Sequence, residues 1–162
     1  MKFNSNPSVG SSGDFLKLKD GESVVGVFRG DILEYHCKWN GSKSVKCDAE
    51  EKGAKFRFRI NFVTKQGDAL KSVLWEQGAQ VYNDLKALNG DYPLEQFFMK
   101  ITRKGAGMND TEYHILPVPN GQLDATKEAM VAAVPLQDLN SGLDNTQAAQ
   151  PPMPTQADEL PF

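Results

Sequence analysis

Residues 55–63, KFRFRINFV, alternate between polar and apolar side chains, and this limits the fold more than any other stretch of the chain. Successive side chains of a β-strand point to opposite faces, so a period of two predicts a strand with one buried face. The positions predicted to face the core are Phe56, Phe58, Ile60 and Phe62. The opposite, solvent-facing positions are Lys55, Arg57, Arg59 and Asn61. The strand would therefore carry a row of three cations with no acid among them.

Four further strands and one helix are predicted in the rest of the 162 residues. The first strand covers residues 22–35, and its internal Gly26 and Gly30 indicate bulges or tight bends. Apolar residues recur at helical spacing within 76–90, which predicts a helix that ends at Gly90. The other predicted strands are 69–75, 96–104 and 111–117, the last stopped by its proline.

The order of three strands, one helix and two strands fits an all-β fold, the five-stranded β-barrel with one helix called the OB-fold. Other small α+β folds could use the same elements. We expect a flexible arm over 1–14, an OB-fold domain over 15–117 and a largely disordered acidic tail over 118–162. One candidate helix lies in that tail, at 123–134.

Charge is divided unevenly along the chain. Residues 1–117 contain 17 Lys and Arg against 15 Asp and Glu, whereas residues 118–162 contain 1 against 6. The pI of about 5.4 therefore hides a mildly basic body with an acidic tail. The chain has two cysteines, no signal peptide and no long apolar run, which predicts a cytoplasmic protein with reduced thiols.

The row of cations suggests a site for a nucleic-acid backbone, since phosphate contacts supply most of such affinity. The alternative is an ordinary half-buried strand with a basic solvent face. The long polar stretch 36–53 adds aromatics between cations, which suits sequence-tolerant binding of single strands because every base can stack. The candidate nucleic-acid-binding residues are Tyr35, Lys38, Trp39, Lys43, Lys46, Lys55, Arg57, Arg59, Arg103, Lys104 and Tyr113.

Metal and enzyme sites have weaker support in the sequence. Structural zinc sites use four ligands, with paired cysteines two to four residues apart. Cys37 and Cys47 are ten residues apart with His36 beside the first, so two ordinary thiols are the better interpretation. Two histidines and the absence of a phosphate-binding loop or nucleophile elbow leave no catalytic set. We expect a binding protein that is not an enzyme and has no cofactor or metal.

Two parts of the sequence resemble a known family. The ending DELPF resembles the acidic tip of bacterial single-stranded DNA-binding proteins, which end in aspartates followed by Ile-Pro-Phe. The body is similar to phage-type single-stranded DNA-binding proteins with one OB-fold. This second resemblance rests on KFRFRIN, QVYNDLKALN and KITRKGAGMNDTEYHILP, and it covers roughly residues 54–117.

The resemblance implies a sequence-tolerant single-stranded DNA-binding protein of replication, recombination or repair, located in a bacterial host if phage-encoded. In that family the tip recruits partner proteins: the terminal phenylalanine enters a pocket and the acids meet basic residues around it. The matching residues here are Asp158, Glu159, Leu160, Pro161 and Phe162. An RNA-binding OB-fold protein and a clamp-binding adaptor remain alternatives. The oligomeric state stays open, with a cooperatively binding monomer as one expectation, and no membrane partner is expected.

Overall fold

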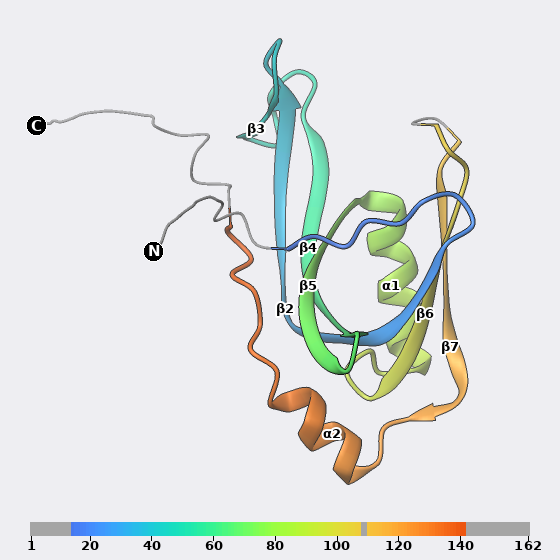
Figure 1. Cartoon of the computed structure of the whole chain (residues 1–162). Coiled ribbons are helices and arrows are strands. Elements are labelled where there is room, and N and C mark those ends of the chain that lie inside the picture. The colour runs from blue at the N-terminus through green and yellow to red at the C-terminus, as the bar shows by residue number, and fades with distance from the viewer. Residues whose placement is uncertain (1–13, 108–109, 142–162) are drawn as a thin grey trace, which may run out of the picture.

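The computed structural model describes residues 14–107 and 110–141, and one antiparallel β-sheet is the main element of that part (Figure 1). Its strands follow the order β5-β4-β2-β6-β7, and β3 pairs separately with β2. The mostly β fold predicted from the sequence is confirmed at this level. The elements are β2 (Ser23–Trp39), β3 (Ser44–Cys47), β4 (Lys55–Gln66), β5 (Ala69–Gly78), α1 (Ala79–Asp91), β6 (Phe97–Lys104), β7 (Glu112–Gln122) and α2 (Ala125–Ala132).

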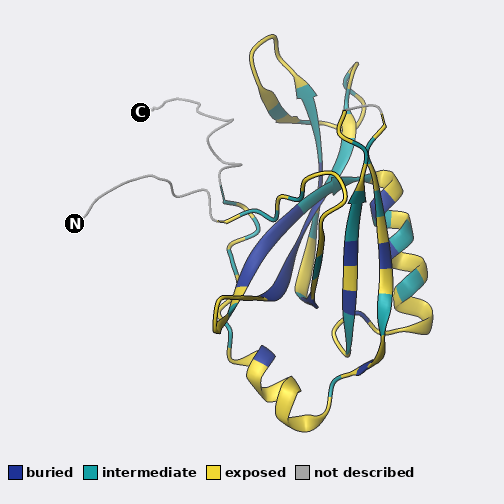
Figure 2. Cartoon of the chain, turned by 45° about the vertical axis from the view of Figure 1, so that its right-hand side comes forward, coloured by how far each residue is buried: buried dark blue, intermediate teal, exposed yellow. Residues whose placement is uncertain are grey.

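The main core lies between the inner face of the curved sheet and α1 (Figure 2). The alternation in β4 has the predicted effect: Phe58, Ile60 and Phe62 are buried there, and Phe56 packs partly against the same cluster. Val81 and Leu85 bring α1 onto this core. Burial of these apolar side chains is the main force that holds the helix against the sheet. The core positions read from the alternation of β4 are therefore confirmed.

Strand β2 joins the two parts of the sheet. It pairs with β4 along most of its length and with β6 near its beginning. Its register with β4 shifts between Arg29 and Ile32, where Gly30 has a φ of 79°. Glycine adopts this left-handed conformation without the steric cost that a Cβ would add. The bulge predicted at Gly30 is thus present, and it separates two stretches of β2 that both pair with β4.

The end of β2, β3 and the beginning of β4 extend beyond the other strands at the top of Figure 1. We call this three-stranded projection the finger; it comprises Tyr35–Trp39, Ser44–Cys47 and Lys55–Arg57. Strand β3 lies inside the polar stretch 36–53, where no strand was predicted. Its sequence, SVKC, is too short to show a pattern, and pairing with β2 gives it its conformation.

Several predicted ends differ from the observed ones: β2 continues to Trp39, β5 continues to Gly78, and the helix begins at Ala79 and not at 76. Helix α1 contains Gly90 and ends at Asp91, one residue later than predicted. Strand β7 continues past Pro117 to Gln122. Proline lacks the N–H that a central strand would need, but it is tolerated on an edge strand. Since β7 stands at one end of the strand order, the strand does not stop there.

The chain after β7 packs against the outer face of the sheet, the side of β4 opposite Phe58, Ile60 and Phe62. Val131 of α2 joins Val27 and Val63 in a second small cluster. The helix predicted within 123–134 is confirmed as α2, and Asp124 caps it by accepting a hydrogen bond from Lys127 N at 2.8 Å. Residues 118–141 therefore continue the fold beyond the boundary expected at 117. The segment after α2 runs upward beside β2 in Figure 1.

Candidate nucleic-acid interface

Strand register places six of the candidate residues on the outer face. Tyr35 lies opposite Arg57, and Cys37 lies between Lys46 on β3 and Lys55 on β4. Directly paired residues of an antiparallel sheet share a face, and every second residue along a strand returns to it. One continuous surface thus runs from the finger onto β4. The candidates on it are Tyr35, Trp39, Lys46, Lys55, Arg57 and Arg59.

Trp39 is the most exposed aromatic on this surface. It ends β2 at the tip of the finger, paired with Ser44, and 67% of the residue is accessible. The exposed cations Lys46 and Lys55 occupy the adjoining strands on the same face. An accessible indole ring next to cations can stack on a base while the cations meet phosphates. The exposure predicted for Trp39 is confirmed.

Tyr35 was also expected to be exposed, but only 7% of the residue is accessible. Its hydroxyl donates a hydrogen bond to Glu76 Oε1 at 2.5 Å. The Arg59 guanidinium lies 5.8 Å from the centre of its ring. The prediction that Tyr35 is an exposed stacking platform is therefore wrong for this structure, because the phenol is part of a buried polar cluster on β4 and β5.

Glu76 is the centre of that cluster. Its carboxylate accepts hydrogen bonds from Arg59 Nε at 2.7 Å and Arg57 Nη2 at 3.3 Å, besides the one from Tyr35. Burial favours the neutral acid, but hydrogen bonds from Tyr35 and Arg59 outweigh it, so the pKa of Glu76 is lower than usual. Burial, and then the hydrogen bond to Glu76, raises the pKa of Tyr35. The carboxylate is thus charged and the phenol protonated at neutral pH.

The C-terminal segment covers part of the cation row. Arg59 Nη1 donates to Leu139 O at 3.1 Å and to Ser141 O at 2.5 Å, and Arg59 is only 6% accessible. Asn61 exchanges hydrogen bonds with the Gln137 backbone at 2.7 and 3.1 Å. The prediction that Arg59 and Asn61 face solvent is wrong, because a segment nearly eighty residues later lies over them. Any phosphate contact of Arg59 stays a prediction that requires this segment to move.

Lys55 and Arg57 occupy the uncovered end of the row. Lys55 is exposed and Arg57 partly so. Arg57 lies opposite Gly78, and a Cβ built on that glycine would stand 3.8 Å from Arg57 Nη1. Since Gly78 has no side chain, nothing from that residue covers the guanidinium. These two cations are the best placed on β4 to meet a phosphate.

The remaining candidates lie elsewhere. Lys38 is on the other side of the finger and forms an ion pair with Glu51. Arg103 donates to Leu18 O at 2.7 Å, Gly105 O at 3.2 Å and Thr111 Oγ1 at 3.3 Å, so it holds the β6–β7 hairpin to the chain before β2. Tyr113 packs edge-on against Trp75, with 5.4 Å between ring centres. Lys43, in the turn between β2 and β3, and Lys104, at the end of β6, are exposed.

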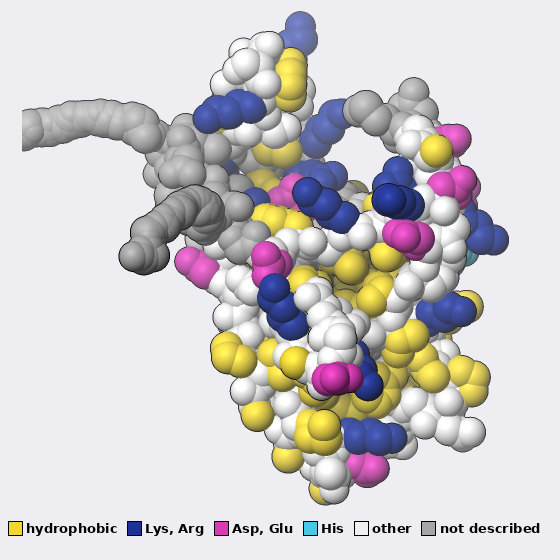
Figure 3. All heavy atoms as spheres, viewed as in Figure 1, with side chains coloured by type: hydrophobic (Ala, Val, Ile, Leu, Met, Phe, Trp, Pro, Cys, Tyr) yellow, Lys and Arg dark blue, Asp and Glu magenta, His cyan; other side chains and the backbone are white. Residues whose placement is uncertain are grey.

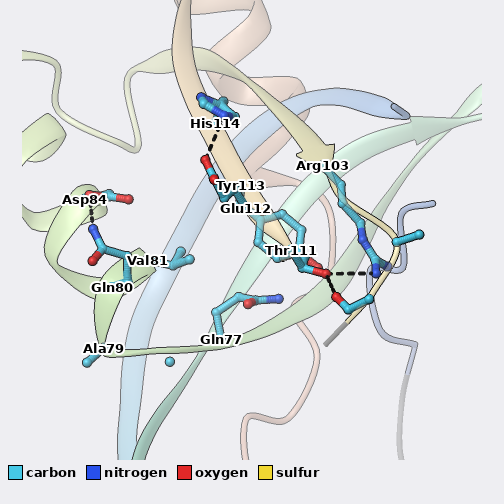
Figure 4. A pocket seen from close by; sticks show the side chains of 13 residues that line it. Gln77, Ala79, Gln80, Val81, Asp84, Arg103, Thr111, Glu112, Tyr113 and His114 are labelled. Atoms are coloured by element: carbon cyan, nitrogen blue, oxygen red, sulfur yellow. Dashed lines mark hydrogen bonds and ion pairs between the residues drawn. The ribbon is translucent and has the colours of Figure 1, made fainter. Parts of the chain in front are cut away.

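A cavity of about 820 Å³ lies between the end of β5, the beginning of α1 and the β6–β7 hairpin. Gln77, Gly78 and Gln80 line one side and Thr111, Tyr113 and His114 another (Figure 4). In the space-filling view, Lys and Arg side chains gather on the finger and around the hollow between it and the β6–β7 hairpin (Figure 3). Cations thus lie on both sides of the region between the finger and the hairpin, together with Asp and Glu side chains on the hairpin side.

Sequence reasoning missed Glu76 and the glutamines Gln77 and Gln80. Glu76 lies opposite Arg59 across the β4–β5 pair, and that pairing was the signal that could have found it. Over residues 14–107 and 110–141, no group of three or more His, Cys, Asp and Glu side chains could hold a metal ion. Within the same ranges Cys37 and Cys47 are not bonded to each other. Neither described helix has the length and apolar character that crossing a bilayer requires.

The tip residues Asp158 to Phe162 lie outside the described residues, so their role stays a prediction. Comparison of the chain with protein-family models, with curated proteins and with solved structures found no match.

Proposed function

We propose that this chain is a sequence-tolerant single-stranded DNA-binding protein that acts in replication, recombination or repair without being an enzyme. The observation that carries the proposal is the face shared by the accessible Trp39 and the cations Lys46, Lys55 and Arg57. Stacking on an indole needs a base with an open face, which single strands offer and an intact duplex does not. The cations supply attraction that is independent of sequence.

We further propose that the sheet is an OB-fold. Strands β2, β4 and β5 follow one another as antiparallel neighbours, α1 comes next, and β6 returns to pair with β2. This order supports the assignment. In that fold, nucleic acid lies across the second and third strands between two loop regions. The corresponding strands here are β4 and β5, and the corresponding loop regions are the finger and the β6–β7 hairpin.

The resemblance of DELPF to the family tip supports a second role, recruitment of partner proteins through Phe162. RNA binding and clamp binding are the alternatives, and the cations on the face favour a nucleic acid over a protein. DNA and RNA differ at the 2′-hydroxyl, which a titration distinguishes.

Replacing both Lys55 and Arg57 with alanine is expected to weaken single-stranded DNA binding and to flatten its dependence on salt. Each lost phosphate contact reduces the slope of log affinity against log salt by roughly 0.7 on single strands. The slope is measured by fluorescence anisotropy with a labelled oligonucleotide at several salt concentrations.

The matched control for this charge removal is Lys86→Ala/Lys100→Ala, which also removes two exposed cations but on α1 and β6. It should leave the slope close to that of the wild type. Equal slopes in the Lys55/Arg57 variant and the wild type would contradict the proposed interface. Failure of the wild type to bind any single strand would contradict the function itself.

A further inference from the structure

The cavity beside Gly78 differs chemically from the cationic surface that borders it. Arg103 is a cation in its wall, but its guanidinium donates to Leu18 O, Gly105 O and Thr111 Oγ1. The imidazole of His114 lies 3.6 Å from the Glu112 carboxylate. A second acid, Asp84, also lines the cavity. An anionic phosphate would meet two carboxylates there, so the cavity suits an uncharged ligand better.

The cavity also presents polar groups without partners. Among the described residues, neither the Gln77 amide nor the Tyr113 hydroxyl has a hydrogen-bond partner. Gln80 Nε2 donates to Asp84 Oδ1 at 3.3 Å, which leaves the Gln80 carbonyl and the other carboxylate oxygen able to accept. Figure 4 shows Gln77 from β5 and Tyr113 from β7 beside the same hollow. The side chains of this wall therefore offer two free acceptors close together, the Gln80 carbonyl and the second Asp84 oxygen.

The position of the cavity connects it to a bound strand. Gly78, which lines the cavity, is the residue paired with Arg57 in the sheet, so a phosphate held by Arg57 would place a neighbouring nucleotide near the opening. A volume of about 820 Å³ lies within the common range for small-molecule pockets and can accept one base turned away from the strand. A base turned in this way presents its Watson–Crick edge to the wall.

We propose that this cavity is a subsite for one nucleobase that selects bases with an exocyclic amino group over thymine and uracil. The inference rests on the proposed single-strand binding. Adenine, cytosine and guanine carry amino donors that match the carboxylate and amide oxygens of Asp84, Gln77 and Gln80. Uracil and thymine lack this amino group: where cytosine carries it they carry a carbonyl oxygen, which a carboxylate repels. Binding would then be tolerant of sequence along most of the strand and selective at one position.

The test compares oligodeoxycytidine with oligodeoxyuridine of equal length at pH 7.5, by fluorescence anisotropy. These bases are similar in size and stacking, but cytosine has an amino group and an accepting ring nitrogen where uracil has a carbonyl oxygen and a ring N–H. One well-made pair of hydrogen bonds discriminates by about 1–3 kcal/mol, so we expect the cytidine strand to bind about tenfold more tightly.

Gln77→Leu should reduce the ratio of cytidine-strand affinity to uridine-strand affinity toward one. It should leave the affinity for the uridine strand nearly unchanged. Asp84→Asn adds an amide donor where an acceptor stood, so it should tighten uridine binding, an effect that loss of structure would not produce. Gln66→Leu, at the exposed last residue of β4, is the matched control and should keep the tenfold ratio. Equal wild-type affinities, or a ratio that persists in both cavity variants, would overturn the inference while single-strand binding stands. No binding to either strand would overturn the proposed function and the inference together.

Discussion

Trp39→Ala is expected to weaken single-stranded DNA binding by about 1–3 kcal/mol, the usual contribution of one base stacked on an aromatic side chain. This corresponds to a loss of roughly five- to 150-fold in affinity. The effect should be large because Trp39 is 67% accessible and no other candidate aromatic on the outer face is exposed among the described residues. The affinities are measured by anisotropy with an oligonucleotide of mixed sequence.

Tryptophan fluorescence gives an independent measure of the same contact. The other tryptophan, Trp75, is 1% accessible in the core, so quenching by DNA should come from Trp39 and vanish in Trp39→Phe. That variant retains a ring and should bind more tightly than Trp39→Ala. Leu116→Ala removes a side chain of similar accessibility, 63%, from β7 and should leave affinity unchanged. Quenching that persists in Trp39→Phe would place the strand elsewhere.

Glu76→Ala is expected to lower the free energy of unfolding by about 3 kcal/mol, because it leaves the buried guanidinium of Arg59 without its carboxylate. Tyr35 loses its acceptor in the same variant. Urea denaturation followed by circular dichroism at pH 7 measures the change. Glu50→Gln is the control, since Glu50 is exposed and has no hydrogen bond or ion pair within the described ranges.

The same carboxylate should make stability depend on pH. The folded-state pKa of Glu76 lies below the ordinary value of 4.5, so its ionised form stabilises the fold above that value. This stability is lost as the pH falls through the lower folded-state pKa. Glu76→Gln cannot ionise, so its stability deficit relative to the wild type should be largest at pH 7 and should shrink toward pH 3. If Glu76→Gln lost the same free energy of unfolding at pH 7 and at pH 3, the conclusion that the ionised Glu76 carboxylate stabilises the fold would be contradicted.

The fold was predictable where neighbours in sequence determine the conformation. The alternation in 55–62 gave the buried and outer sides of β4, since period two is a local property of a strand. Gly30 gave the bulge in β2 for a similar reason, because the backbone conformation of one residue decides it. Strand β3 was not predictable, since pairing with β2 rather than its own four residues determines it.

The site was predictable at Trp39 and unpredictable at Arg59. A tryptophan within a polar stretch is left exposed because it has no apolar neighbours to pack against, and this is visible in the sequence. Arg59 was expected to face solvent because the alternation of its strand places it on the side opposite the buried phenylalanines. Glu76 of the adjoining strand and the backbone of residues 139 and 141 surround it instead. Contacts between residues so distant in sequence depend on the tertiary fold, which a local pattern does not contain.

The most direct test of the proposed function is an anisotropy titration of the whole chain with single-stranded DNA, duplex DNA and RNA of matched length and sequence at moderate salt. We predict clearly tighter binding of single-stranded DNA than of the duplex, because Trp39 can stack only on a base with an open face. Tighter binding of RNA would favour the alternative of an RNA-binding protein. Equal affinity for duplex and single strands would contradict the account.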